Sequence, residues 1–258
     1  MLKKRLVFTL LYQHGYFMLS RNFRLQKVGN LKWLQSNYDF SRISFSIDEL
    51  VVLDVSRGQR KLDDFCHALK ELSQGCFVPV AAGGGVNSVD AARKLLRSGA
   101  DKVVINSSIY NDIDFVSQLA SEFGQQCVVA SMDVKSSLDG IYRVWSDCGS
   151  VCRPGTAAHW INQLSEAPIG ELYLNSMERD GTGQGYDLRL LDLLPRTMTK
   201  PVILAGGVGN ASHLATGLAD RRVDAVATAH LFNFVGDGLK QAREALISSG
   251  INLPVWGS

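Results

Sequence analysis

The chain has 258 residues, of which 46% are hydrophobic and 20% are charged, as expected for one large globular domain with a substantial core. A formal net charge of +2 gives no reason to expect a nucleic acid or a membrane as partner. The five cysteines are odd in number and lack a framework spacing, which favours reduced thiols in a cytoplasmic protein. Cys148 and Cys152 have no second Cys/His pair nearby, so we expect loop thiols and no metal site.

The first predicted strand is 5–11, an apolar run too short for a signal peptide or a membrane span. His14 and Gly15 then predict a turn into a second strand at 16–19. Residues 21–37 are basic and show no clear period. We therefore expect a surface segment or an active-site flap there.

The next strand, 49–55, precedes a helical spacing of apolar residues over 61–72. A third strand, 77–82, runs into three glycines at 83–85, and Asn87 is expected to cap a helix over 89–98. Glycines in such a turn let backbone N–H groups approach an anion at the start of a helix. The turn is therefore a candidate phosphate site.

The rest of the chain continues the alternation. A helix with Asp112 as its cap and Gly124 as its end is expected before the fifth strand, a hairpin excursion at 136–153, and a final helix at 239–248. Helical stretches are expected after most of the strands. The later strands are predicted at 102–106, 127–134, 171–175, 202–205 and 225–229.

The chain carries an internal repeat. The glycine turn recurs at Gly206 and Gly207, 122 residues after Gly84 and Gly85, and 49–54 recurs as 171–176. Four alternating strands and helices in each half predict a parallel sheet closed into a single (β/α)₈ TIM barrel. We expect one domain over 1–258, built from two duplicated half-barrels at about 1–123 and 124–258.

Two matching glycine turns suggest two anions, most simply one long ligand with a phosphate at each end. The alternative is one phosphate site and a remnant of the duplication. The sequence leaves both readings open.

In such barrels the active site lies at the C-terminal ends of the strands. Asp133 ends an apolar strand there and is the leading acid–base candidate, because partial burial can raise its pKa. The alternative is a helix cap or a satisfied loop carboxylate. The repeat places Leu11 at the matching position of the first half, so a two-carboxylate mechanism requires Asp54 or Asp180 as substitute. His230 follows the last strand and could touch a ligand or be structural.

These motifs resemble the cyclase subunit of imidazole glycerol phosphate synthase, the HisF family. The resemblance covers nearly the whole chain and is carried by 48–54, 83–86, 99–103, 180–187 and 206–207. It implies a barrel that docks a HisH-like glutaminase at its N-terminal face. Ammonia released by that glutaminase would pass through the barrel core to the site at the other end, without a cofactor.

The resemblance also implies residue roles. Asp133 would be catalytic and Asp101 would face the glutaminase. A ring of charges at the base of the barrel would gate ammonia: Arg5, Glu49, Lys102 and Glu171. A phosphorylated small molecule would be bound by Gly84, Gly85, Asn106, Ser107, Asp180, Gly181, Gly206, Gly207 and Ala229, with His230 beside them.

Three departures affect the cyclase chemistry. Leu11 replaces the family's second aspartate, Leu19 replaces a lysine of the first hairpin, and His230 replaces a phosphate-binding serine. This combination resembles the divergent HisF-like proteins associated with glycosyl amidation in surface polysaccharide synthesis. Those are thought to act with a glutaminase and a separate sugar amidotransferase.

We therefore expect a subunit that channels ammonia for amidation of a cell-surface sugar, such as one of a lipopolysaccharide O-antigen. Two alternatives remain. One is a true cyclase of histidine biosynthesis that makes imidazole glycerol phosphate, and the other is a non-catalytic scaffold.

Overall fold

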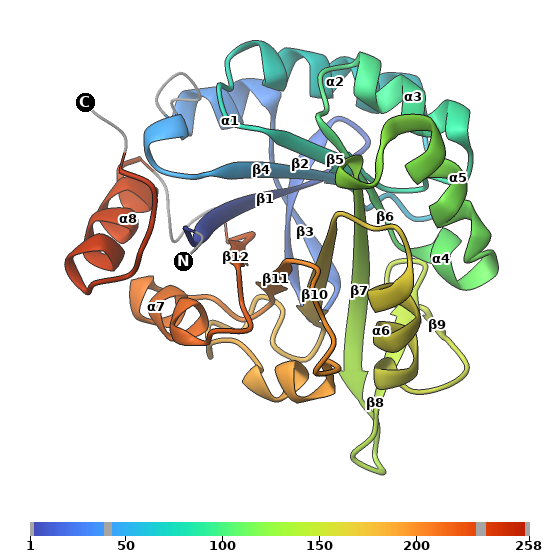
Figure 1. Ribbon diagram of the computed structural model, residues 1–258. Helices are drawn as coiled ribbons and strands as arrows, with labels where there is room; N and C mark the ends of the chain where they lie inside the picture. Colours follow the sequence, from blue (N-terminus) through green and yellow to red (C-terminus); the bar gives the residue numbers. More distant parts are fainter. Residues whose placement is uncertain (1–2, 39–42, 231–235, 256–258) are drawn as a thin grey trace.

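The computed structural model describes residues 3–38, 43–230 and 236–255. Within them, parallel strands form a closed barrel, because β10 pairs with both β11 and β7 (Figure 1). This confirms the predicted (β/α)₈ TIM barrel. The eight barrel strands, in order around the ring, are β1 (Arg5–Gln13), β4 (Glu49–Asp54), β5 (Val80–Gly83), β6 (Lys102–Ile105), β7 (Val128–Ser136), β10 (Glu171–Ser176), β11 (Val202–Ala205) and β12 (Ala225–Thr228).

Helices follow the strands and cover the outside of the barrel (Figure 1). Short 3₁₀ turns lie at Ile43–Phe45, Gln125–Cys127 and Leu188–Leu193. The described α-helices are α1 (Leu31–Asn37), α2 (Leu62–Gln74), α3 (Val89–Arg97), α4 (Ser107–Asn111), α5 (Asp114–Phe123), α6 (Ala157–Glu166), α7 (Ala211–Ala219) and α8 (Gly238–Ser248).

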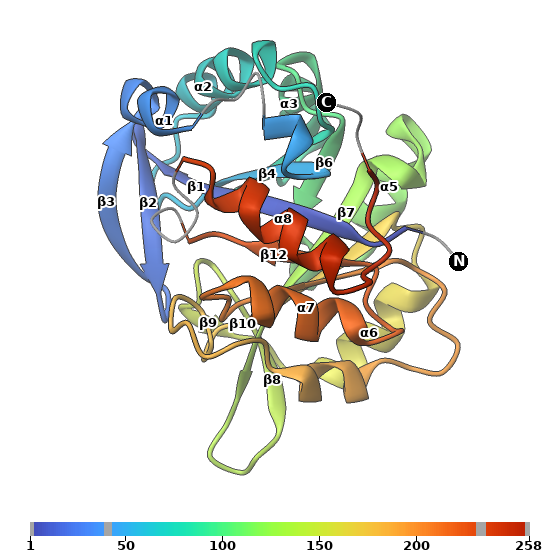
Figure 2. The same cartoon turned by 90° about the vertical axis from the view of Figure 1, so that its left-hand side faces the viewer.

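Two antiparallel excursions extend the sheet. The predicted first hairpin is confirmed as β2 (Tyr16–Arg21), which pairs with the end of β1, and the predicted second one as β8 (Tyr142–Ser146) with the short β9 (Val151–Cys152). Figure 2 shows β2 at the end of the barrel opposite the N-terminus. Both excursions therefore leave from the C-terminal ends of barrel strands.

Residues 21–37, which show no clear period in the sequence, form regular secondary structure. The segment forms β3 (Arg24–Asn30), paired with β2, and then α1. A register shift between Phe17 and Met18 disturbs this pairing, and basic residues stand on the exposed strand, so no simple alternation is visible. Asn30 starts α1 by accepting a hydrogen bond from the Trp33 amide.

The helix ends show one further correction. Ser88, not Asn87, caps α3, because its Oγ accepts from the Ala91 amide at 3.2 Å. Asp112 accepts from the Asp114 amide at the start of α5 as a capping side chain would, and Gly124 ends that helix as predicted. Which of two neighbouring residues caps a helix depends on the backbone angles at that position, and the type of side chain alone does not determine it.

Alternation along β1 divides the core into two parts. Leu6, Phe8 and Leu10 pack outward against the helices, whereas Val7 belongs to a second cluster inside the ring. The inner cluster comprises Val7, Val51, Ala81, Val104, Val129, Tyr173, Ile203, Ala205, Ala225 and Ala227. The barrel interior is thus a packed layer of small and branched side chains with one tyrosine.

The two halves repeat a specific contact. Asp101 Oδ2 accepts from the Val80 amide at 2.8 Å, and Asp224 Oδ2 accepts from the Val202 amide at 3.0 Å. Each carboxylate ties the start of one strand to the start of its neighbour. The contact aligns β6 with β12, so that Asn106 and Ser107 correspond to Ala229 and His230.

Candidate functional site

A cavity of about 690 Å³ lies at the C-terminal ends of the barrel strands. The polar residues at these ends are brought together because parallel strands terminate at the same rim. The cavity is lined by every residue predicted for catalysis or phosphate binding: Gly84, Gly85, Asn106, Ser107, Asp133, Asp180, Gly181, Gly206, Gly207, Ala229 and His230.

Asp133 is held by two amides from neighbouring strands. Asn106 Nδ2 donates to its Oδ2 at 2.9 Å, and Asn175 Nδ2 donates to its Oδ1 at 2.8 Å. Burial raises the pKa of Asp133 to about 6, although the two donated hydrogen bonds act in the opposite direction. A carboxyl group with this pKa can take or give a proton near neutral pH.

Leu11 lines the same cavity as Asp133, and Leu19 of β2 lines it too. Asp54 and Asp180, the acids considered as substitutes for a second catalytic aspartate, both accept hydrogen bonds from the protein. Asp54 accepts from the Ser56 amide at 2.9 Å. Asp180 accepts from Ser20 Oγ and from the Phe23 amide, and its charge contributes to raising the pKa of Asp133. One wall of the cavity is therefore aliphatic where a second proton-handling group would stand.

The glycines of the two turns are required by close backbone packing. Gly84 has φ +111°, and a Cβ there would collide with the backbone of Asp54. Gly206, with φ +90°, would collide in the same way with Ser176. Sequence reasoning attributed these glycines to an approaching anion, whereas the structure shows that the chain itself occupies the adjacent space.

Two arginines of the site were missed by sequence reasoning. Arg57 and Arg60 follow β4 and line the cavity beside the first glycine turn. Arg57 Nη2 donates to Phe23 O at 2.8 Å and so also holds the first hairpin. Their position a few residues beyond a predicted strand end was the only available signal in the sequence.

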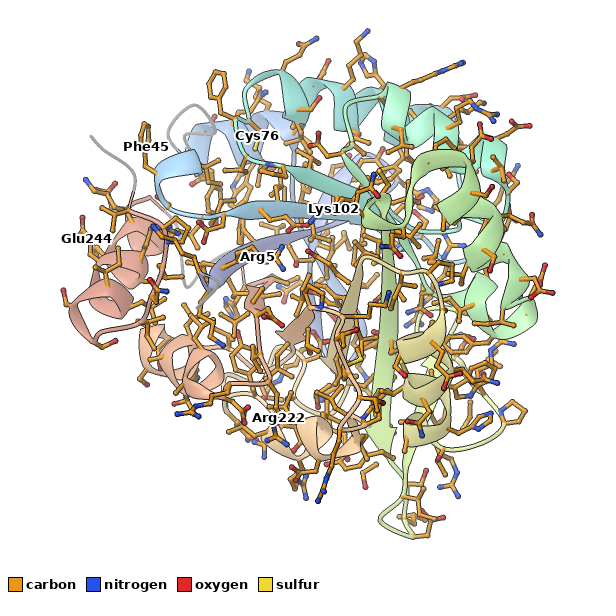
Figure 3. The ribbon with its side chains drawn as sticks, in the orientation of Figure 1. Arg5, Phe45, Cys76, Lys102, Arg222 and Glu244 are labelled. Carbon is orange, nitrogen blue, oxygen red and sulfur yellow. The ribbon has the colours of Figure 1, made fainter. Side chains whose placement is uncertain are left out.

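At the opposite end of the barrel, four charged side chains form a closed ring. Arg5 Nη1 lies 2.8 Å from Glu49 Oε2 and 2.9 Å from Glu171 Oε1, and Lys102 Nζ lies 3.0 and 3.3 Å from the same two carboxylates. Burial raises the pKa of Glu49, opposed by the two cations. Figure 3 shows Arg5 and Lys102 near the centre of the ring of strands. The predicted gate residues are thus in mutual contact.

Between this ring and the cavity lies the inner cluster of buried side chains. The cavity ends at Thr9, Ser131 and Tyr173, and the Tyr173 hydroxyl is hydrogen-bonded to Thr9 Oγ1 at 3.0 Å. Beneath them lie Val7 and Ile203, both fully buried. Any small molecule that moves along the axis must displace these side chains.

Comparisons with known proteins agree with this geometry. The sequence model of a family described as "Histidine biosynthesis protein" matches residues 40–236. The chain is 44% identical over 257 residues to a protein of Parasynechococcus marenigrum designated imidazole glycerol phosphate synthase subunit hisF2, covering 99% of this chain and 95% of that protein. The chain belongs to the HisF family.

Two further relatives carry the name imidazole glycerol phosphate synthase subunit HisF. The protein of Chlorobaculum tepidum is 34% identical, with 98% of this chain and 99% of the relative covered. That of Chlorobium limicola is 37% identical over 204 residues, or 79% of this chain and 81% of the relative. The match to the HisF family therefore extends over the whole barrel.

The HisF-family barrel places Asp101, the residue expected to face a partner, at the base of the barrel beside Lys102. Its side chain is exposed apart from the bond to the Val80 amide.

None of the helices in the described ranges combines the length and apolar character needed to cross a membrane. In those ranges no three His, Cys, Asp or Glu side chains gather as a metal site would require.

Proposed function

We propose that this HisF-family chain is the ammonia-handling subunit of a glutamine-dependent amidotransferase for a cell-surface sugar. It receives ammonia from a HisH-like glutaminase at the Arg5–Lys102 face and delivers it at the Asp133 cavity to a separate sugar amidotransferase. The supporting observation is the pairing of an intact charged ring with an aliphatic cavity wall. The base retains all four charges, whereas the aliphatic Leu11 lines the same cavity as Asp133.

The ring suits a gate because its charges are mutually compensated. Two cations and two anions neutralise one another at the entrance, so opening needs exchange of ion-pair partners and leaves no charge uncompensated. The inner cluster between the ring and the cavity is apolar and buried. Transfer of ammonia then requires small displacements of Val7, Tyr173 and their neighbours, which surround the axis.

The test is reconstitution with the glutaminase and the sugar amidotransferase. Substituting Ala225, a fully buried interior residue, by Leu should abolish amidation driven by glutamine and leave amidation driven by ammonium salt unchanged. Ala81→Leu provides a second blocking variant if the first fails to fold. Undiminished glutamine-driven amidation in a folded blocked variant would refute passage of ammonia through the barrel and favour the scaffold alternative.

A true cyclase is a second candidate, favoured by one observation. Asp133 has a pKa of about 6 and is aligned by Asn106 and Asn175, as a single acid–base catalyst would be. A cyclase assay with ammonium salt and the ribulose-type intermediate as substrates decides between the two candidates. Robust turnover that is lost in Asp133→Asn supports the cyclase and refutes the role restricted to ammonia transfer.

A further inference from the structure

One tyrosine stands inside the barrel among small and branched side chains. Alternate residues of a strand share one face, so Glu171, Tyr173 and Asn175 of β10 all face the interior. Glu171 belongs to the charged ring at the base, and Asn175 donates a hydrogen bond to Asp133. Tyr173 therefore lies between the ring and the buried acid, within the interior that the proposed function assigns to ammonia.

The hydroxyl of Tyr173 reaches across this interior. It is hydrogen-bonded at 3.0 Å to the Oγ1 atom of Thr9, which belongs to β1. Around the barrel, β1 and β10 are separated by β11 and β12 in one direction and by four strands in the other. A side-chain bond between strands that are not neighbours has to pass through the space that the strands enclose. Tyr173 and its bond to Thr9 therefore form a bar across the barrel.

This bar lies where the inner cluster meets the cavity. Tyr173, Thr9 and Ser131 all line the cavity, and all three are almost fully buried. Ser131 is paired with Tyr173 in the register of β7 and β10. The inward-facing residues that come before Thr9 and Ser131 on their strands are the apolar Val7 and Val129 of the inner cluster. A small molecule that leaves this cluster toward Asp133 therefore meets three hydroxyl groups.

Ammonia matches such a group of hydroxyls. Its nitrogen accepts a hydrogen bond through the lone pair, and its N–H groups donate to oxygen atoms. Burial raises the pKa of Tyr173, so its hydroxyl keeps the proton that it can donate, while Thr9 and Ser131 can accept. Breaking the bond between Tyr173 and Thr9 without a substitute would leave buried polar groups unpaired, which is unfavourable. Ammonia avoids that loss because it provides both an acceptor and donors.

We infer that Tyr173 is an exit gate on the ammonia route. Its bond to Thr9 holds the side chain across the interior. An ammonia molecule that arrives from the inner cluster accepts from the Tyr173 hydroxyl and donates to Thr9 and Ser131, and the tyrosine then turns aside. Ammonium has no lone pair to accept this bond, so the uncharged molecule opens the gate. The inference rests on the proposed function and adds a second gate at the end of the inner cluster opposite the charged ring.

The first experiment uses the complex reconstituted with the glutaminase and the sugar amidotransferase. The measured quantity is the rate of amidation driven by glutamine, divided by the rate driven by ammonium salt. Tyr173→Phe keeps the ring and removes the hydroxyl, and it should lower this ratio by about threefold or more, with the missing ammonia released into solution. Thr9→Val removes the other half of the bond and should have the same effect, which preserves the test if the first variant fails to fold.

Tyr186→Phe is the matched control. Tyr186 is buried like Tyr173, and its hydroxyl donates to the Ala227 carbonyl oxygen at 3.1 Å, but its ring packs in the outer core. The control removes a comparable bond without changing a side chain of the interior, so the ratio should stay at the native value. An unchanged ratio in folded Tyr173→Phe, or an equal fall in Tyr186→Phe, would overturn the inference.

The second experiment needs neither partner. Carbon-13 NMR of the full chain, labelled at the tyrosine Cζ atoms, reports the hydrogen bonding of each hydroxyl, and Tyr173→Phe identifies the Tyr173 signal among the seven tyrosines. At about pH 9, where part of the ammonia is uncharged, this signal should move saturably as ammonia is added. Trimethylamine, which has no N–H group, and sodium chloride at equal ionic strength should leave it in place. A Tyr173 signal that does not respond to ammonia would overturn the inference.

The two experiments separate the gate from the proposed function. If the Tyr173 signal responds to ammonia while Ala225→Leu leaves glutamine-driven amidation undiminished, the route through the barrel is refuted and the ammonia site at Tyr173 stands. If Ala225→Leu abolishes that amidation while Tyr173→Phe keeps the native ratio, the route stands and the gate is refuted.

Discussion

Asn175 donates a hydrogen bond of 2.8 Å to Asp133, from the strand adjacent to that of the acid. With the matching bond from Asn106, it holds both carboxylate oxygens while leaving the group at the cavity surface. The two neutral amides therefore favour the ionised form of Asp133, against the burial that disfavours it.

Asp133→Asn should alter the pH dependence of stability. The folded pKa of about 6 exceeds the unfolded value of 3.8, so stability contributed by the protonated form is lost as pH rises through 6. The free energy of unfolding of the variant, relative to that of the native chain, should therefore rise by about 1–2 kcal/mol between pH 4.5 and pH 7. Urea unfolding at the two pH values measures it. In the control Asp139→Asn the difference should stay flat over this range, because Arg143 and the Ile141 amide hold the pKa of Asp139 at about 2.

Asn175→Ala should raise the pKa of Asp133 above 6. The variant removes a donor that favours the carboxylate, while the burial that disfavours it remains. A carbon-13 NMR titration of the Asp133 carboxyl reports the value directly. Ser165→Ala, in a partly exposed position of α6, serves as a control without effect. A lowered pKa in the Asn175 variant would show that solvent entry outweighs the lost bond.

Glu49→Ala should destabilise the barrel by about 3 kcal/mol, because Arg5 and Lys102 then share one carboxylate in a mostly buried ring. The double variant Glu49→Ala/Lys102→Ala should lose less than the sum of the single losses. Chemical unfolding of the four proteins measures the coupling. Glu71→Ala, which removes an exposed pair with His67, is expected to cost below about 0.5 kcal/mol. Equal losses of stability in Glu49→Ala and Glu71→Ala would contradict a stabilising role for the charged ring.

Gly84→Ala should cost more stability than Gly58→Ala, although both glycines have positive φ. A Cβ at Gly84 meets the Asp54 backbone, whereas one at Gly58 meets nothing within 4 Å. We expect about 1 kcal/mol for Gly58 and more than about 2 kcal/mol for Gly84. Thermal unfolding compares the variants. Similar losses would mean that the loop after β5 relaxes easily.

Local patterns were sufficient for most of the fold. Apolar runs located the barrel strands, and the 122-residue offset identified corresponding turns, such as those at Gly84 and Gly206. The place of Asp133 at the cavity was predictable for the same reason, since this residue ends one of the apolar runs. The alternation of β3 escaped because this strand is largely exposed and basic.

Contacts between distant residues could not be predicted in this way. Thr9 and Tyr173 are 164 positions apart, and nothing near either one indicates their hydrogen bond. The place of Arg60 over Gly85 depends on a loop conformation that no spacing encodes. The roles of individual side chains within the cavity therefore required coordinates, whereas the position of the cavity did not.

Closure of the sheet has a consequence for how the chain loses its structure. The pairings of β6 with β7 and of β12 with β1 join the halves along two seams, and Glu171 completes a charge cluster otherwise contributed by the first half. Separating the halves would expose four unpaired strand edges and leave Arg5 and Lys102 with only the carboxylate of Glu49. Unfolding should consequently be cooperative across the whole barrel, with neither half persisting as a folding intermediate of its own.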